Sequence, residues 1–273
     1  MLYLLQELFI NNWRVLRIFK SIMLRASVAF MIAFLFMLIL GKPFIAWLKK
    51  KKYGDTAREE GPKSHFDKSG TPTMGGLLII GAILFATAIA GNFTNKFIVF
   101  LFVITILFTT IGFYDDYLKL TKHKKGLSGK KKILGQLIIT ALTFGFVYKF
   151  GLVSKTIDFS IINPLIKNSY LYITPILFFI FVAFVIIGSS NAVNLTDGLD
   201  GLVSGPTIVV SITLLIITYL TGNVKYAKYL NLYYVPQAAE MIVYLASVIG
   251  ALIGFLWYNF YPAQVFMGDT GSL

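Results

Sequence analysis

Acidic and amide side chains gather in three short stretches of this 273-residue chain, and their types suit chemistry on a phosphate. The stretches are the pair Asp115-Asp116, residues 191–201, and residues 267–271 around Asp269. Enzymes that handle phosphates commonly hold Mg²⁺ with one or two carboxylates. Ionisable side chains in an apolar chain are costly and mark functional sites by default. We therefore expect a metal-dependent enzyme that acts on phosphates, because a passive bundle has no evident use for these carboxylates.

The pair Asp115-Asp116 closes an apolar stretch at the C-terminal end of an expected helix. The helix dipole is already negative there, so a cation must lie close to the two carboxylates. Lys119 and Lys122, one turn further on, could neutralise them and leave them without a catalytic role. Neighbouring residues on a helix point about 100° apart, so one carboxylate could instead face a metal and the other a reacting group. Both interpretations are open.

Polar side chains recur at every third position between residues 191 and 201, namely Asn191, Asn194, Asp197 and Asp200. A helix cap and turn is the simpler interpretation, because Asp-Gly is a common turn signal. A turn does not need four amide or carboxylate groups in register, so the pattern favours a polar ridge that binds a ligand. Asp269 lies among glycines and hydroxyls, and its Asp-Thr-Gly triplet alone indicates little.

Residues 68–76 form a fourth polar segment just before an apolar stretch. Lys68, Thr73 and the neighbouring glycines could offer donors to a phosphate or sugar at a helix start. Ordinary helix entry with Pro72 in the first turn is the alternative. His65 and His123 lie in basic stretches and are interpreted as solvated. The chain has no cysteine, which excludes disulfides, thiolate catalysis and sulfur-ligated metal.

The composition indicates a bilayer protein, because 57% of the residues are hydrophobic and 14% are charged. Seven apolar stretches, with charged residues only near their ends, have the length of about 17 to 25 residues that a membrane-spanning helix needs. They lie at residues 26–48, 72–91, 97–116, 133–150, 171–190, 203–221 and 241–258. We expect an all-α polytopic integral membrane bundle formed by one domain, residues 1–273. Residues 1–20 are predicted to form an interfacial helix and not a removable signal peptide.

The distribution of lysine and arginine predicts the orientation. The connections at residues 49–72 and 117–132 each carry seven basic residues, and the alternate connections carry one or two. Basic loops stay in the cytoplasm, which places the N-terminus outside. Every acidic stretch then reaches the cytoplasmic face, with residues 191–202 and 259–273 as the active-site segments.

Four motifs occur in an order that resembles the phospho-N-acetylmuramoyl-pentapeptide-transferases, within the polyprenyl-phosphate N-acetyl-hexosamine-1-phosphate transferase group. They are residues 69–76, the pair Asp115-Asp116, residues 191–202 and residues 266–273. Two of these motifs are similar to those of the muramoyl branch. Their sequences are Asn-Ala-Val-Asn-Leu-Thr-Asp-Gly-Leu-Asp-Gly and Thr-Pro-Thr-Met-Gly-Gly. Related branches that use other UDP-sugars have different sequences at these positions.

The resemblance implies transfer of phospho-MurNAc-pentapeptide from its UDP carrier to undecaprenyl phosphate, giving lipid I and UMP. It implies Mg²⁺ as cofactor and an active site on the cytoplasmic side of the cell (inner) membrane. By motif, Asp269 is the implied metal ligand, Asp116 a second acid near the metal, and Asp115 the base or phosphate-orienting group. Membrane lipid and a possible homodimer are the other expected partners, and no nucleic acid is expected.

The implied substrate-binding residues are polar side chains, glycines and two apolar neighbours within the motifs. They are Lys68, Thr73, Lys119, Lys125, Asn191, Asn194, Leu195, Asp197, Gly198, Asp200, Asn259, Phe266 and Gly268. Asn194, Asp197 and Asp200 are implied on the nucleoside and sugar side. Lys119 and Lys125 could receive the pyrophosphate.

Two other classes of protein stay open. An ion-coupled transporter would carry its acids at mid-span, on broken helices, in two matching halves, whereas these acids lie at span ends and no repeat is evident. A noncatalytic scaffold is the second alternative. The family has about ten spans, with about three further spans and a histidine-rich loop after the last motif found here. We therefore expect a shortened chain that is not active alone.

Overall fold

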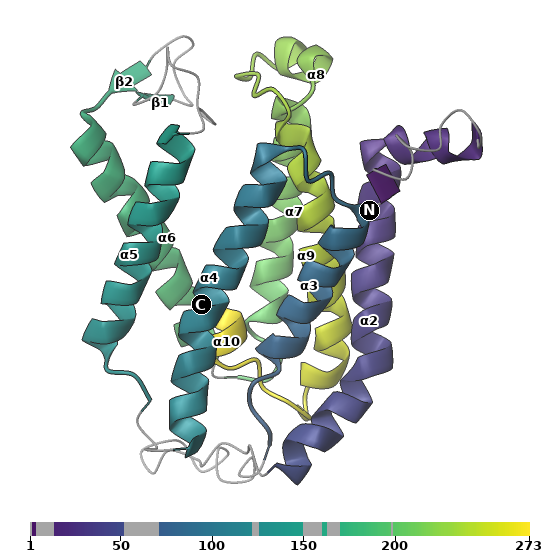
Figure 1. Ribbon diagram of the computed structural model, residues 1–273, viewed down its shortest axis with the longest axis vertical. Coiled ribbons are helices and arrows are strands. Elements are labelled where there is room, and N and C mark those ends of the chain that lie inside the picture. The colour runs from purple at the N-terminus through teal and green to yellow at the C-terminus, as the bar shows by residue number, and fades with distance from the viewer. Residues whose placement is uncertain are drawn as a thin grey trace.

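Apolar helices stand side by side and account for most of the described chain (Figure 1). The computed structural model describes residues 2–3, 14–51, 71–121, 126–149, 160–162, 170–197 and 199–273. The long apolar helices are α2 (Ile22–Lys50), α4 (Lys96–Thr121), α5 (Gly129–Lys149), α6 (Pro175–Thr196), α7 (Ser204–Thr221) and α9 (Met241–Asn259), together with the shorter α3 (Gly76–Ala90). The predicted all-α membrane bundle is confirmed.

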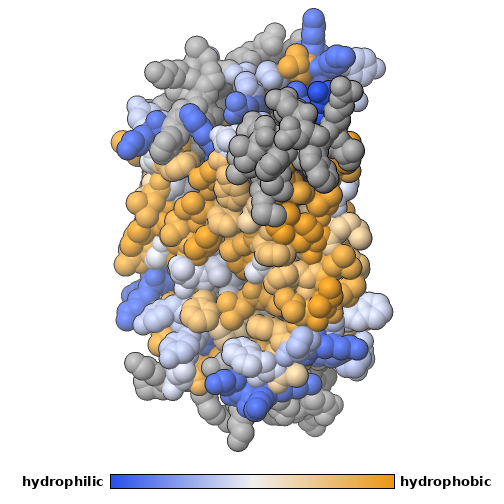
Figure 2. Space-filling model, turned by 45° about the vertical axis from the view of Figure 1, so that its right-hand side comes forward, coloured by the Kyte–Doolittle hydropathy of each residue, from blue (hydrophilic) through white to orange (hydrophobic). Residues whose placement is uncertain are grey.

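Six of these helices are long and apolar enough to cross a membrane, and α3 falls short with 15 residues. At 1.5 Å per residue α3 covers about 22 Å, less than the roughly 30 Å of a hydrocarbon core. The predicted span at residues 72–91 is therefore shorter as a helix, because residues 72–75 are used in a non-helical contact described below. Figure 2 shows the resulting broad hydrophobic band between two ends where hydrophilic residues gather.

The core lies mainly between α2, α3 and α9. Its larger cluster includes Met37 of α2, Ala82 of α3, and Ala251 and Phe255 of α9, all of them buried. The Tyr258 hydroxyl also donates to the Leu38 carbonyl oxygen at 2.9 Å, which ties α9 directly to the backbone of α2. These contacts fix the helix that leads into residues 260–273.

A buried ion pair joins the same three helices at their other end. Arg25 of α2 is 1% exposed and donates to both carboxylate oxygens of Glu240, at 2.9 and 2.5 Å. Glu240 ends the short helix η3 (Ala238–Glu240) directly before α9, and Arg25 also donates to the carbonyl oxygen of Ala90 at the end of α3. A bidentate pair of this kind adds geometric specificity to the apolar packing.

The remaining elements lie at the ends of the bundle. At one end are the short helix α8 (Val224–Tyr229) and the antiparallel pair β1 (Ser160–Ile162) and β2 (Tyr170–Tyr172), in which Ile161 faces Leu171 (Figure 1). The helix η1 (Arg14–Lys20) precedes α2, and its place at a membrane interface stays a prediction. Most of the expected loop at residues 49–72 lies outside the described residues. Helices α4 and α5 extend into the expected loop at residues 117–132.

Candidate active site

Residues 266–268 return into the bundle and pair with the segment that precedes α3. The Phe266 amide donates to the Pro72 carbonyl oxygen at 2.9 Å, and the Gly75 amide donates back to the Phe266 carbonyl oxygen at 2.9 Å. The Gly76 amide donates to the carbonyl oxygen of Met267 at 2.8 Å. Two of the motifs found in the sequence therefore form one backbone unit, which leads directly into the turn α10 (Asp269–Ser272).

Two glycines allow this unit to reach α4. Gly268 has a φ of 73°, in the left-handed region that favours glycine. Gly112 of α4 lies against α10 so closely that a Cβ there would overlap the carbonyl oxygen of Asp269. This close approach places Asp269 beside the pair Asp115-Asp116, one turn further along α4.

Asp116 binds the start of α10 with both carboxylate oxygens. Its Oδ1 accepts from the Asp269 amide at 3.2 Å, and its Oδ2 accepts from the Thr270 amide at 2.8 Å and the Thr270 hydroxyl at 2.5 Å. Asp116 is 2% exposed. A buried carboxylate satisfied by three donors fixes the loop that carries Asp269, so the structure gives Asp116 a positioning contact.

Asp115 and Asp269 share two lysine ammonium groups. Lys119 Nζ lies 2.9 Å from Asp115 Oδ2 and 2.8 Å from Asp269 Oδ2. Lys132 Nζ, from α5, lies 2.5 Å from Asp269 Oδ2 and 3.3 Å from Asp115 Oδ2. Asp115 Oδ1 also accepts from the Leu127 amide. The cation expected near Asp115 is therefore Lys119 together with Lys132, and Lys122 lies outside the described residues.

The charges around Asp269 and Asp197 have opposite effects on their acidity. Burial disfavours ionised Asp269, but the side chain of Asp115 and the ammonium groups of Lys119 and Lys132 outweigh it, so the pKa of Asp269 lies well below its usual range. Asp197 lies just after α6, and burial together with the carboxylates of Asp269 and Asp116 raises its pKa to about 7. The amide of Gly268 only partly offsets this rise.

The polar residues at the end of α6 reach the same loop. Asp197 Oδ2 accepts from the Gly268 amide at 2.8 Å. The Asn194 amide group contacts the Ser272 hydroxyl at 2.8 Å. With its oxygen and nitrogen exchanged, it also donates to Asp269 Oδ1 at 2.9 Å and accepts from Lys132 Nζ at 3.2 Å. Asn194 and Asp197 thus lie at the carboxylate centre, the group formed by Asp115, Asp116 and Asp269 with Lys119 and Lys132.

The other two members of the expected ridge have different neighbours. Asn191 Nδ2 donates to the oxygen of the buried Gln136 side chain at 2.8 Å, which ties α6 to α5. Asp200 Oδ2 accepts from the Ala263 amide at 3.1 Å. Helix α6 ends at Thr196, so the period of three does not continue as one helical face. The four side chains bind different neighbours and do not form a single ridge.

The remaining predicted substrate residues differ in placement. Asn259 is 1% exposed and braces the turn, accepting from the Gly201 amide at 3.0 Å and donating to the Val265 carbonyl oxygen at 2.9 Å. Leu195 is 86% exposed, and Phe266 joins the backbone unit described above. Thr73 lies beside Gly268, where its hydroxyl would meet a Cβ. Lys68, Lys125 and Gly198 lie outside the described residues.

Lys132 is the site residue that the sequence analysis missed. In the sequence, the run Lys130 to Lys132 indicates only the membrane orientation. One signal was available, because Lys132 lies four residues before Gln136 and therefore on the same face of α5. An amide at position 136 inside an apolar helix already indicated that this face is buried.

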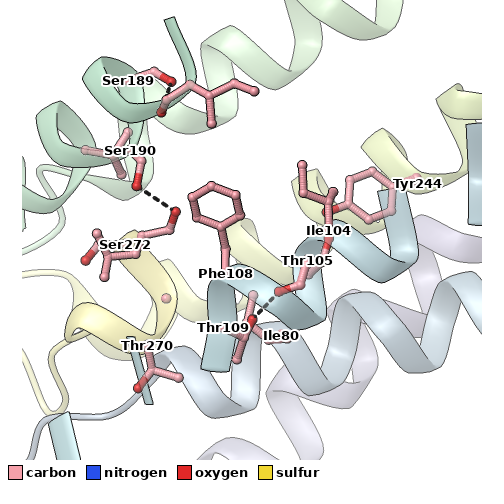
Figure 3. A pocket seen from close by; sticks show the side chains of 14 residues that line it. Ile80, Ile104, Thr105, Phe108, Thr109, Ser189, Ser190, Tyr244, Thr270 and Ser272 are labelled. Carbon is pink, nitrogen blue, oxygen red and sulfur yellow. Dashed lines mark hydrogen bonds between the residues drawn. The ribbon is translucent and has the colours of Figure 1, made fainter. Parts of the chain in front are cut away.

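A cavity of about 370 Å³ lies next to α10, between α3, α4, α6 and α9 (Figure 3). Apolar side chains such as Ile80 and Phe108 line it together with hydroxyls such as Thr105, Ser190 and Tyr244. None of its lining residues is a carboxylate or a lysine. The described carboxylates and lysines of this region therefore lie outside the cavity.

The carboxylates suit a metal that is completed by its substrate. Within the described ranges, no three carboxylate or histidine side chains form a ready-made metal site. Mg²⁺ commonly uses one or two carboxylates plus water and substrate phosphates. Asp269, whose depressed pKa keeps it ionised, is the described carboxylate that would fit this donor set once Lys119 and Lys132 leave its Oδ2.

An apolar helical bundle with a carboxylate and lysine centre defines a multi-pass membrane protein whose charged residues suit phosphate chemistry. Residues 97–273 match the model of glycosyl transferase family 4, and residues 68–80 match phospho-N-acetylmuramoyl-pentapeptide-transferase signature 1. The chain is 48% identical over 274 residues to the phospho-N-acetylmuramoyl-pentapeptide-transferase of Fusobacterium nucleatum, covering 100% of this chain and 74% of that protein. It is 43% identical over 259 residues to the transferase of the same name from Thermodesulfovibrio yellowstonii, covering 94% of this chain and 71% of that protein.

The chain therefore belongs to the phospho-N-acetylmuramoyl-pentapeptide-transferase family. The resemblance drawn from the four motifs is confirmed.

Proposed function

We propose that this protein transfers phospho-N-acetylmuramoyl-pentapeptide from UDP-MurNAc-pentapeptide to undecaprenyl phosphate, giving lipid I and UMP for peptidoglycan synthesis. Family membership supports this reaction. The observation that carries it is the convergence of Lys119 and Lys132 on the Asp115 and Asp269 carboxylates. A phosphate that attacks a pyrophosphate brings several negative charges together, and this centre supplies fixed positive charge beside potential metal ligands.

The lysines are proposed to bind the substrate phosphates. Lys119 and Lys132 now pair with Asp115 and Asp269, and incoming phosphate oxygens would compete for the same ammonium groups. Lys125 is proposed to join them at the pyrophosphate. Release of the lysines would leave the Asp269 carboxylate to hold Mg²⁺, which when bound supplies Lewis-acid polarisation of the pyrophosphate.

The two aspartates of α4 are proposed to have separate roles. Asp115, whose Oδ2 faces both lysines, would orient the lipid phosphate or take its proton. Asp116, whose oxygens accept from the Asp269 and Thr270 amides, would hold the metal-binding loop and stay close to the metal. This division follows the different hydrogen-bond partners of the two carboxylates.

The nucleoside and sugar are proposed to lie along the segment that follows α6. Asn194 and Asp197 face the Asp269 loop and would contact the sugar side. Lys68, Thr73, Gly198, Asp200, Phe266 and Gly268 complete the proposed substrate surface, with Asn191, Leu195 and Asn259 at its edges. Asn259 would act mainly by holding the turn at Gly201.

The chain spans the membrane several times, and its orientation belongs to the proposal. We place the carboxylate centre at the cytoplasmic face and the N-terminus outside, because the basic connections flank the carboxylates. UDP-sugars are made in the cytoplasm, so this orientation is the one that the reaction requires. We also propose that two copies of the protein form a homodimer.

A transferase for another UDP-sugar is the nearest alternative, and the match to signature 1 favours the muramoyl substrate. An ion-coupled transporter is not favoured, because the described carboxylates of the centre lie at helix ends and are bound to lysines and to the α10 loop. A scaffold without activity would not need the shared lysines.

The test is release of UMP, in detergent with a polyprenyl phosphate, by an enzyme that joins this chain to the further C-terminal spans expected for the family. UDP-MurNAc-pentapeptide and UDP-N-acetylglucosamine are supplied in separate reactions. We expect UMP with the first donor only. UMP with the second donor only would indicate a related branch, and no UMP with either donor would contradict the transferase.

A further inference from the structure

The connection between α7 and α9 is folded and held in place at the end of the bundle opposite the carboxylate centre (Figure 1). Asn223 caps α8 by accepting from the Lys225 amide at 3.0 Å. The Leu232 amide donates to the Ala227 carbonyl oxygen at 2.8 Å, and the Val235 amide donates to the Thr221 carbonyl oxygen at 2.9 Å. These hydrogen bonds hold the connection in one folded conformation.

This surface, residues 224–234, exposes a dense set of aromatic and aliphatic side chains. The exposed fraction is 86% for Tyr229, 57% for Val224 and 45% for Tyr226 and Leu230. Leu232, Tyr233 and Tyr234 are also exposed. Exposed apolar surface of this density marks an interaction site.

The surface carries a positive charge that no acidic residue of the same segment neutralises. Lys225 and Lys228 are exposed and lie three residues apart, which places them on one face of α8. The sequence from residue 201 to residue 239 contains no aspartate or glutamate. An anionic partner therefore meets no like charge along this segment.

The depth of the surface follows from the length of α7. Its 18 residues cover about 27 Å, close to the roughly 30 Å of a hydrocarbon core. Only two residues separate the end of α7 from the start of α8, so α8 lies at the level of the lipid headgroups. Tyrosine is enriched at this level, and lysine there is attracted to anionic headgroups.

We propose that residues 224–234 form an interfacial anchor that binds the headgroup region of the bilayer, with the tyrosines in the boundary layer and Lys225 and Lys228 on anionic lipid phosphates. The anchor fixes the depth of α7 and α9 in the membrane. Helix α9 leads into the segment that carries Asp269, so the anchor also fixes the depth of the helix next to the carboxylate centre.

A nitroxide label tests the anchor. The chain has no cysteine, so Tyr229→Cys or Tyr233→Cys gives one labelling site on the whole chain. The protein is placed in nanodiscs of phosphatidylcholine, with or without phosphatidylglycerol. We expect the ratio of collisions with oxygen to collisions with a water-soluble nickel chelate to exceed that of free nitroxide in buffer. The ratio should rise further when phosphatidylglycerol is present.

Charge variants separate lipid recognition from simple proximity. Lys225→Gln and Lys228→Gln should lose the rise caused by phosphatidylglycerol. Lys149→Gln, an exposed lysine of α5 at the same end of the bundle, should keep it. A collision ratio equal to that of free nitroxide would overturn the anchor and indicate a surface in water or against a protein. A ratio unaffected by phosphatidylglycerol or by the lysines would overturn the role of anionic headgroups.

Discussion

Lys132 Nζ lies 2.5 Å from Asp269 Oδ2, which joins α5 to a turn 137 residues further along the chain. Lys119 reaches the same carboxylate oxygen from α4. The centre is therefore assembled from three separate segments, and its charge balance depends on two lysines with different surroundings. Lys119 has a side chain that is 37% exposed, whereas that of Lys132 is 12% exposed.

Replacing Lys132 by methionine should lower the rate of UMP release by roughly 100-fold, because one fixed cation at the reacting phosphates is lost. Lys131→Met is the matched control, since Lys131 is its neighbour in sequence and is exposed. The rate is measured with saturating UDP-MurNAc-pentapeptide. Equal rates for the two variants would remove Lys132 from the centre.

Asp197→Asn should stabilise the protein at alkaline pH. The folded pKa of about 7 lies above the ordinary value of 3.8, so the folded state holds the proton more tightly than the unfolded state. Ionised Asp197 therefore costs stability progressively as pH rises from about 4 to 7, and fully above that window. Asparagine carries no such cost and can still accept from the Gly268 amide.

Thermal unfolding in detergent checks this sign. The melting temperature of Asp197→Asn should exceed that of the wild type by a few degrees at about pH 8, with little difference near pH 4. The same increment at both pH values would show that the effect is not the titration of Asp197.

Glu240→Gln should destabilise the bundle by about 3 to 5 kcal/mol, because Arg25 would keep a buried charge without its partner. Replacing both residues, Arg25→Met with Glu240→Leu, should recover most of the loss. Unfolding followed by circular dichroism gives both values. The rate per folded molecule should stay unchanged, because the pair lies at the opposite end of the helices from Asp269.

The orientation is checked with a reporter that is active only in the cytoplasm. Fusion after Lys125 should give a signal, and fusion within residues 154–168 should give none, because the lysine bias places these connections on opposite sides. The reverse pattern would put the carboxylate centre outside, away from UDP-sugars.

The sequence predicted the bundle well because long apolar stretches have few other solutions in a bilayer. It overestimated α3, since nothing local indicates that residues 72–75 pair with residues 266–267. The roles of Asp115 and Asp269 are implied by the family resemblance of their motifs and stay predictions. Lys132 was not predicted, because a run of three lysines indicates an exposed surface. The packing of α5 is needed to show which of the three faces inward.

The partners of the amide and carboxylate groups also needed the fold. Asn191 and Asn194 lie three residues apart on α6, yet one bonds Gln136 of α5 and the other reaches Ser272 of α10. Asn259, which is expected near the substrate, is buried and bonds two backbone groups. Such contacts join residues far apart in the chain, and spacing within one segment does not encode them.

Magnesium titration of UMP release by the wild-type enzyme that includes the further C-terminal spans, and by its Asp269→Asn variant, tests the central claim most directly. The substitution keeps the shape of the side chain and removes the charge that would hold the metal. We expect the wild type to need Mg²⁺, and the variant to lose at least about 100-fold in turnover, or about 3 kcal/mol, at any magnesium concentration. Substrate binding should weaken less than turnover. Near-normal turnover of Asp269→Asn with an unchanged magnesium dependence would contradict the assignment of this centre as the active site.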